Sequence, residues 1–196
     1  MRHGIPAAGN FLSQEHTILT GAVDAMVVDV QCIMEAVAPL AQKYHTALIT
    51  TSPKAKMPGA KHIQFDEHHA METAREIIRT AIDAFPNRGQ THIPQIPPAP
   101  AVGGFSHEYL GYMQGGLTRG SFRPLNDAIV AGRIRGVAGV VGCNNARVPH
   151  DEGMMKVIKT LIANDVLVAT TGCTAHASGK YGYLLPEMMQ DAGAGL

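Results

Sequence analysis

The sequence has no tryptophan, few other aromatic residues and only three cysteines. Three is an odd number and too few for the disulfide framework of a small secreted domain. Basic and acidic side chains number 16 each, so the formal net charge is zero, which excludes a strongly basic surface for nucleic acid or anionic membranes. No apolar run approaches the roughly 20 residues of a membrane-spanning helix, and the polar residues after Met1 argue against a secretory signal. We therefore expect a cytoplasmic protein with reduced thiols.

Common catalytic signatures are also missing. The sequence contains neither a G-x-G-x-x-G motif nor a P-loop, and no serine or cysteine nucleophile has a local partner pattern. We therefore assign no catalytic residue to this chain. Ten histidines are present, and most are typical of a solvated surface. His150 and His176 follow two of the cysteines within a few residues, so a place behind a metal ligand or in a proton relay is an alternative for them.

Glycine, in contrast, is frequent, and its 21 residues are typical of a fold with many tight turns between strands and helices. All three cysteines follow a short apolar run, in residues 136–143, 166–173 and, less closely, 25–32. A valine-rich run that is bounded by glycine and followed by a helical pattern is typical of a buried central strand in a parallel sheet. Because ligands bind beyond the carboxyl ends of such strands, we expect the three sulfur atoms along one edge of one sheet.

The sulfur atoms of Cys32, Cys143 and Cys173 are therefore candidate metal ligands. Gly142 and Gly172 precede two of them, which would leave room for an inorganic cluster and turn backbone N–H groups toward it. The sequence has no C-x-x-C motif and its cysteines are far apart, which argues against a structural zinc site and favours an iron–sulfur cluster. Three thiolates do not complete a four-cysteine cluster, so a further ligand is needed. Alternatively, the cysteines are ordinary core residues.

The order of predicted elements, strand and helix in alternation, indicates the α/β class with a Rossmann-like, doubly wound and mostly parallel sheet. Residues 1–85 form a first α/β portion, and residues 101–196 form a second one that carries both Gly-Cys motifs. Between them, residues 86–100 contain five prolines and form a proline-rich linker. This linker either joins two sub-domains or crosses the surface of one. Neither end of the chain carries a cap or a docking segment, so we expect it to be part of a longer polypeptide.

Periodicity and turn residues give the approximate bounds of the elements. Strands are expected at 25–30, 47–51, 61–65, 101–105, 134–141 and 166–170. Helices are expected at 13–19, 33–44, 67–85, 107–114, 125–131, 151–164 and 175–183. Ser13, Asp66 and Ser106 are placed to cap the helices that follow them, and residues 1–10 have the character of a loop.

Several segments resemble the catalytic subunit of anaerobic nickel–iron carbon monoxide dehydrogenase. They are residues 2–8, 10–15, 20–26, 29–34, 134–145 and 165–173. The most specific are Gly-Cys-Asn-Asn, which ends at Asn145, and Thr-Thr-Gly-Cys, which ends at Cys173. The similarity covers essentially the whole chain. Hybrid-cluster proteins, which are related, are less similar at these motifs.

The resemblance implies a nickel–iron–sulfur cluster that oxidises carbon monoxide with water to carbon dioxide, two protons and two electrons. It implies a homodimeric full-length subunit and an electron acceptor such as a ferredoxin. By the match, Cys32, Cys143 and Cys173 hold the irons of the cubane part of the cluster. The family's pendant-iron ligands fall upstream of this chain, and its nickel-binding cysteine and catalytic lysine fall downstream, so the isolated chain should be inactive. The alternatives are a hybrid-cluster-type reductase domain and a non-catalytic α/β module with core cysteines.

Overall fold

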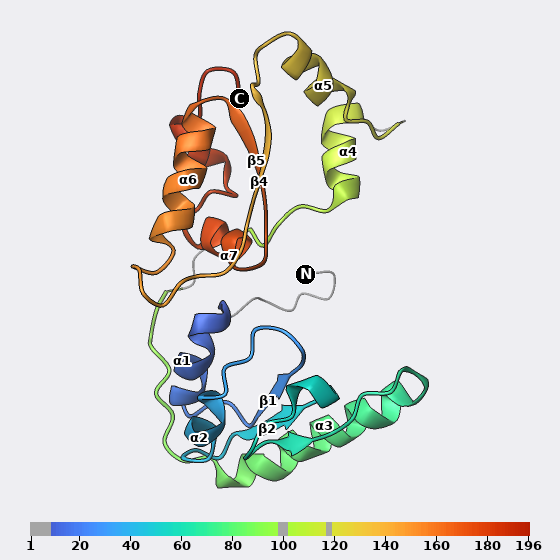
Figure 1. Cartoon of the computed structure of the whole chain (residues 1–196), viewed down its shortest axis with the longest axis vertical. Coiled ribbons are helices and arrows are strands. Elements are labelled where there is room, and N and C mark those ends of the chain that lie inside the picture. Colours follow the sequence, from blue (N-terminus) through green and yellow to red (C-terminus); the bar gives the residue numbers. More distant parts are fainter. Residues whose placement is uncertain (1–8, 98–101, 117–118) are drawn as a thin grey trace. The chain divides into compact units, whose positions relative to one another are not determined.

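The structure is a computed structural model that describes residues 9–97, 102–116 and 119–196. The chain forms two compact units. The first unit comprises residues 11–97, and the second comprises the described residues of 98–196 together with Gly9 and Asn10. Each unit combines helices with parallel strands (Figure 1), so the predicted α/β class with parallel strand pairing is confirmed.

The first unit is built on a three-stranded parallel sheet with the order β1-β2-β3. Its strands are β1 (Ala25–Val28), β2 (Ala47–Thr50) and β3 (Lys61–His62), and its helices are α1 (Gln14–Leu19), α2 (Val37–Ala41) and α3 (Ala70–Ala84). Four 3-10 turns complete it, at Phe11–Ser13, Pro53–Ala55, Glu67–His69 and Phe85–Asn87.

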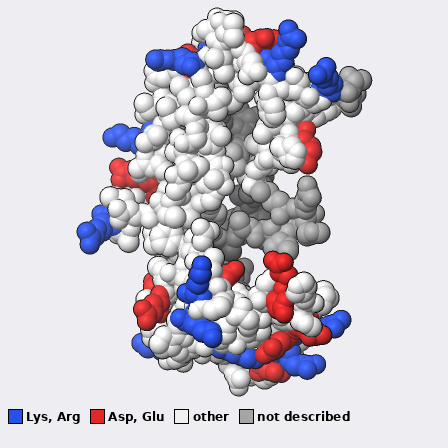
Figure 2. All heavy atoms as spheres, turned by 45° about the vertical axis from the view of Figure 1, so that its right-hand side comes forward, with Lys and Arg blue, Asp and Glu red and all other residues white. Residues whose placement is uncertain are grey.

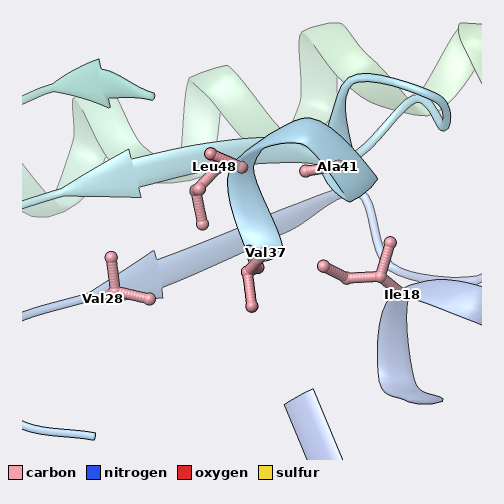
Figure 3. Packing of buried hydrophobic residues seen from close by; sticks show 6 residues of the cluster. Ile18, Val28, Val37, Ala41 and Leu48 are labelled. Atoms are coloured by element: carbon pink, nitrogen blue, oxygen red, sulfur yellow. The ribbon is translucent and has the colours of Figure 1, made fainter. Parts of the chain in front are cut away.

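The core of the first unit lies on both sides of β2. Neighbouring residues of a strand point to opposite faces, and both Leu48 and Ile49 are buried. On the Leu48 side, apolar residues of α1, β1 and α2 form one cluster (Figure 3): Ile18, Val28, Val37, Ala38, Ala41 and Leu48. Helix α3 packs against β1 and β2 as well. The middle strand is therefore covered on both faces, as expected for a parallel sheet.

A charged contact ties the end of α3 back to the start of β1. The guanidinium of Arg88 donates from Nε to Asp24 Oδ1 at 3.1 Å and also contacts Asp24 Oδ2. His45 Nε2 lies 2.9 Å from Asp24 Oδ1. The hydrogen bonds from Arg88 hold the pKa of Asp24 below its usual value, and His45 acts in the same direction, against the opposing effect of burial.

The described residues of the second unit form two parallel strands and four α-helices. Its elements are α4 (His107–Gly115), α5 (Arg123–Val130), β4 (Gly136–Val141), α6 (Glu152–Ala163), β5 (Val166–Thr171), α7 (Gly172–Lys180) and a 3-10 turn at Pro186–Asp191. Strands β4 and β5 pair in parallel along their whole length, from Gly136 with Val166 to Val141 with Thr171. Helices α6 and α7 pack on the strands, and their core consists of Met155, Ile158, Ile162 and Ala177.

The local signals located several elements well. Asp66 Oδ1 accepts from the His68 N–H at 2.9 Å and opens the helical segment that continues into α3. Ser106 Oγ accepts from the Tyr109 N–H at 3.1 Å at the start of α4. The side chain of Ser13, in contrast, makes no capping hydrogen bond to α1. Both confirmed caps are short polar side chains on residues whose own backbone is extended, which is the geometry that capping requires.

Three predictions were wrong. The strands of the described residues form two separate sheets, so the three cysteines do not all follow strands of one sheet. Strands β4 and β5 are not buried on both faces: their residues alternate between partly buried and exposed, and Val137 and Val141 are 51% and 62% exposed. The segment that was expected to be a strand at 101–105 is irregular over residues 102–105, where Gly104 has a positive φ of 137°. Two adjacent glycines give such a segment little tendency to pair.

Some predictions fall outside the described residues. These are the N-terminal loop over residues 1–8, the last residues of the linker and residue 101. Within the described part of the linker, residues 88–97 have no regular secondary structure, whereas Pro86 and Asn87 complete a 3-10 turn. On the face that Figure 2 shows, acidic and basic side chains of the described residues are interspersed. Among the described helices, none has the length and apolar character needed to cross a bilayer.

Candidate metal centre

Two of the three cysteines follow equivalent positions of neighbouring parallel strands. The last ladder pair joins Val141 of β4 to Thr171 of β5. Each strand is followed by a glycine and then a cysteine, so Cys143 and Cys173 leave the same edge of the two-stranded sheet. Cys143 is exposed, whereas Cys173 is partly buried in the first turn of α7. The structure thus brings these two predicted residues to a shared strand end, which is where α/β folds bind ligands.

The glycines before these cysteines adopt conformations that favour glycine. Gly142 has a φ of 140° and Gly172 a φ of 61°, and no atom lies within 4 Å of the position that a Cβ would take at either residue. A side chain at either position would occupy open space next to a thiol. The arrangement fits the expectation that glycine leaves room beside a ligating cysteine for a bulky inorganic group.

Cys32 lies in the first unit, in a bend that follows β1. Its φ is 57°, an uncommon left-handed conformation for a residue other than glycine, and its carbonyl oxygen accepts a hydrogen bond from Gln14 Nε2. The expectation that its sulfur lies on the same sheet as the other two is wrong, because β1 belongs to the three-stranded sheet. A ligand role for Cys32 beside Cys143 and Cys173 stays a prediction.

The exposure of the thiols bears on the alternative in which the cysteines are core residues. Cys32 and Cys143 are exposed and Cys173 is only partly buried, whereas a structural free cysteine is among the most buried residue types. None of the three belongs to either hydrophobic cluster. Core packing therefore does not explain why these positions hold cysteine.

A buried polar network, which the sequence did not reveal, lies behind Cys143. Asn144 and Asp151 are 8% and 1% exposed and are joined by two hydrogen bonds of 2.7 Å. Lys180, the last residue of α7, donates from Nζ to Asp151 Oδ2. Burial alone would raise the pKa of Asp151, but the hydrogen bonds from Lys180 and Asn144 and the charges of Lys180 and His150 outweigh it and lower that pKa. The carboxylate is thus ionised and paired.

The two histidines singled out in the sequence differ in their surroundings. His150 Nε2 lies 3.0 Å from Asn10 Nδ2 and 3.4 Å from Asp151 Oδ1, so it borders the polar network. His176 lies within α7 and is partly buried. Within either unit, the described residues contain no group of three or more His, Cys, Asp or Glu side chains placed to hold a metal ion. A metal site at this strand end would have two thiols from the second unit and would need further ligands.

The whole chain matches one protein family. The model of the Prismane/CO dehydrogenase family matches residues 1–196. Carbon monoxide dehydrogenase 1 of Methanosarcina mazei is 50% identical over 198 residues, which cover 100% of this chain and 31% of that protein. Carbon monoxide dehydrogenase 1 of Carboxydothermus hydrogenoformans is 44% identical, over 95% of this chain and 30% of that protein. The chain therefore spans less than a third of the length of these relatives.

Solved structures give the same picture. Carbon monoxide dehydrogenase IV from Carboxydothermus hydrogenoformans has a TM-score of 0.88 and 47% identity, over 100% of this chain and 31% of that chain. A structure of acetyl-CoA synthase/carbon monoxide dehydrogenase, described as containing NiZn[Fe4S4] and NiNi[Fe4S4] clusters, has a TM-score of 0.85 and 43% identity, over 100% of this chain and 30% of that chain. Identity at this level, over the whole chain, extends to both units.

Proposed function

The chain belongs to the Prismane/CO dehydrogenase family, and from this premise we propose that it forms part of the catalytic subunit of an anaerobic nickel–iron carbon monoxide dehydrogenase. The whole protein oxidises carbon monoxide with water to carbon dioxide, two protons and two electrons. One observation carries the proposal: Cys143 and Cys173 leave one sheet edge at matching positions, in a chain that is 50% identical throughout to a named carbon monoxide dehydrogenase.

In this proposal, Cys32, Cys143 and Cys173 hold irons of a nickel–iron–sulfur cluster. The donor set fits such a group, since soft, solvent-accessible thiols favour iron–sulfur clusters and two of them stand beside glycines with open space. When bound, the cluster supplies Lewis-acid activation of the substrate and a path for electrons. The remaining ligands come from outside this chain, so the chain alone does not turn over carbon monoxide.

The protein's own contribution is to hold and orient the ligands. Strands β4 and β5 deliver two thiols to one edge, and Gly142 and Gly172 keep side chains away from the space beside them. The buried contacts of Asn144 fix the backbone next to Cys143. Groups behind the ligands commonly set their orientation and the potential of the metal.

A first experiment tests the ligand assignment. The chain is reconstituted anaerobically with iron and sulfide, and iron content and visible absorbance are measured. We expect the parent to gain a charge-transfer chromophore, and the Cys143→Ser and Cys173→Ser variants to lose most of it, because serine oxygen is a poor ligand for iron–sulfur clusters. Thr171→Ser, at an exposed position two residues before Cys173, is the matched control. If the triple cysteine-to-serine variant takes up as much iron as the parent, the ligand assignment is wrong.

A second experiment tests the reaction. The segment of the Methanosarcina mazei relative that matches this chain is replaced by residues 1–196, and oxidation of carbon monoxide is measured with an artificial electron acceptor. We expect the hybrid to oxidise carbon monoxide, and the hybrid that also carries Cys143→Ser to be inactive. A hybrid that binds its cluster but does not oxidise carbon monoxide would favour the hybrid-cluster-type reductase. The relatives named above are all carbon monoxide dehydrogenases, which favours the first outcome.

The proposal also covers the setting of the whole protein. We place it in the cytoplasm as a homodimer that passes its electrons to a carrier such as a ferredoxin. The cysteine content, odd in number and too low for the disulfide framework of a secreted domain, supports the cytoplasmic assignment. The native mass of the full-length protein, and its rate of reduction of a ferredoxin under carbon monoxide, test the other two statements.

A further inference from the structure

A buried carboxylate lies between the two elements that carry the cysteines of the second unit. The side chain of Asp151 is 0% exposed, although it sits in the loop between β4 and α6 and not in the apolar core. An ionised carboxylate in such a position is costly unless charged and hydrogen-bonding partners surround it. Its partners are therefore informative, and they come from two separate parts of the chain.

On one side, Asp151 holds the loop that carries Cys143. Asn144 Oδ1 accepts from the Asp151 N–H at 2.7 Å, and Asn144 Nδ2 donates to Asp151 Oδ1 at 2.7 Å. The two bonds close a ring, so the side chain of Asn144 cannot rotate without breaking both. Since Asn144 follows Cys143 directly, this ring restricts the backbone that presents the thiol.

On the other side, Asp151 holds the helix that carries Cys173. Its Oδ2 accepts from Lys180 Nζ at the far end of α7. A second link joins the same two elements, because Thr174 Oγ1 donates to the Gly142 carbonyl at 3.2 Å and Thr174 is 1% exposed. The residue after one cysteine is thus bonded to the residue before the other. Together with the strand ladder, these links fix α7 against the Cys143 loop.

We propose that Asp151 is a positioning residue that fixes the spacing of the Cys143 and Cys173 thiols before any metal binds, through Asn144 on one side and Lys180 on the other. The inference rests on the proposed function only in treating these two thiols as a ligand pair. Its consequence is preorganisation: a thiol-seeking ligand binds both sulfur atoms without first having to order the Cys143 loop against α7.

The simpler reading, in which Asp151 only stabilises the fold, has a matched control in the same unit. Asp165 also has a positive φ, 60° against 64° for Asp151, and lies just before β5, at the sheet edge opposite the cysteines. Its Oδ1 accepts from the Gly195 N–H at 2.7 Å. Asparagine tolerates this backbone conformation, so Asp151→Asn and Asp165→Asn each keep the local geometry and remove one charge.

The test uses the full chain with Cys32→Ser, which leaves two thiols, in reduced and metal-free form. The probe is phenylarsine oxide: two As–S bonds form, and the oxide oxygen leaves as water with the two thiol protons. We expect one arsenic per chain, shown by intact mass. Asp151→Asn should weaken the binding constant at least about tenfold, because the Cys143 loop must then be ordered against α7 on binding. Asp165→Asn, which keeps an acceptor for the Gly195 N–H, should leave this constant unchanged.

Alkylation of single thiols with iodoacetamide should change little in either variant, which separates spacing from accessibility. If Asp151→Asn does not fold, the same measurement is made on Lys180→Met. This change keeps the two hydrogen bonds between Asn144 and Asp151 and removes only the link to α7. An unchanged arsenic-binding constant in Lys180→Met would overturn the proposal. Equal weakening by the two aspartate variants, or failure of the parent to bind arsenic through both thiols, would also overturn it. If arsenic binding follows the expectation but iron–sulfur reconstitution fails, the positioning role stands and the cluster assignment falls.

Discussion

The cysteine of the first unit and those of the second unit are presented by different means. Cys32 follows an edge strand through an irregular bend, and its carbonyl oxygen accepts a hydrogen bond from Gln14. Cys143 and Cys173 follow a continuous ladder and are backed by buried hydrogen bonds. The positions of the Cys143 and Cys173 thiols therefore depend on strand pairing between distant parts of the chain. The position of the Cys32 thiol depends on a few local dihedral angles.

The largest losses of stability should come from changes in the two hydrophobic cores. These changes test whether the two units unfold independently. Ile49 is 0% exposed in the first unit and Ile158 is 1% exposed in the second. Truncation of either to alanine should lower the free energy of unfolding by about 2–5 kcal/mol. Hydrogen exchange measured by mass spectrometry should show faster exchange only in the unit that carries the change. Faster exchange in both units from either variant would show that the two units unfold together, and would contradict the prediction.

A smaller effect should follow from a change at the start of α7. Gly172 has a φ of 61°, and an alanine there should cost about 1–2 kcal/mol because its Cβ crowds the following carbonyl in the left-handed conformation. Gly139, in the middle of β4, does not have a positive φ, and the position that a Cβ would take there is open space. Gly139→Ala should therefore not lower the stability in this way. Urea unfolding of the two variants measures the difference. Equal losses would mean that backbone conformation is not the reason for glycine before Cys173.

Acid should weaken the first unit through Asp24. Because the hydrogen bonds from Arg88 lower the pKa of Asp24 in the folded state, its stabilisation is present above the unfolded pKa of about 4 and is lost as the pH falls through the lower folded value. Hydrogen exchange of β1 and β2 as a function of pH should show this loss. Asp24→Asn should flatten the acid dependence of the first unit and leave that of the second unit as it is. A parallel change in both units would contradict the assignment.

The smallest effect on stability should appear in alkali, in the second unit. Burial, together with the hydrogen bond from Tyr183 to Asp191, raises the pKa of Tyr183 to about 12. A raised pKa in the folded state means that the contribution to stability is present below the unfolded pKa of about 10 and is lost as the pH rises through about 12. One of the five tyrosines should therefore ionise late in an absorbance titration. Tyr183→Phe should remove that late phase, and an unchanged titration would contradict the prediction.

The sequence was sufficient where the deciding signal is local. Asp66 located the helical segment that continues into α3, and Ser106 located the start of α4, because capping needs only the next few residues. The Gly-Cys pairs were placed correctly at strand ends for the same reason. The start of α7 was expected at Ala175, and the helix begins three residues earlier, at Gly172.

The sequence was insufficient where distant residues decide. Nothing near Asp151 indicates that Lys180, 29 residues away, neutralises it. The valines of β4 and β5 have the composition of buried central strands, yet their exposure depends on which helices cover each face. The hydrogen-bond capacity of Asn144, directly after a cysteine, was the one available hint, since a buried amide must find partners.

The backbone at Cys32 has a consequence for how mutations there should be chosen. A left-handed residue with a Cβ carries a local energetic penalty that glycine avoids. Replacing Cys32 by glycine would therefore remove the backbone penalty together with the sulfur. Replacing it by serine would keep the penalty and exchange only the sulfur for oxygen. If Cys32→Gly has a higher free energy of unfolding than the parent but takes up less iron on reconstitution, the unfavourable backbone at this position is retained because the thiol is needed.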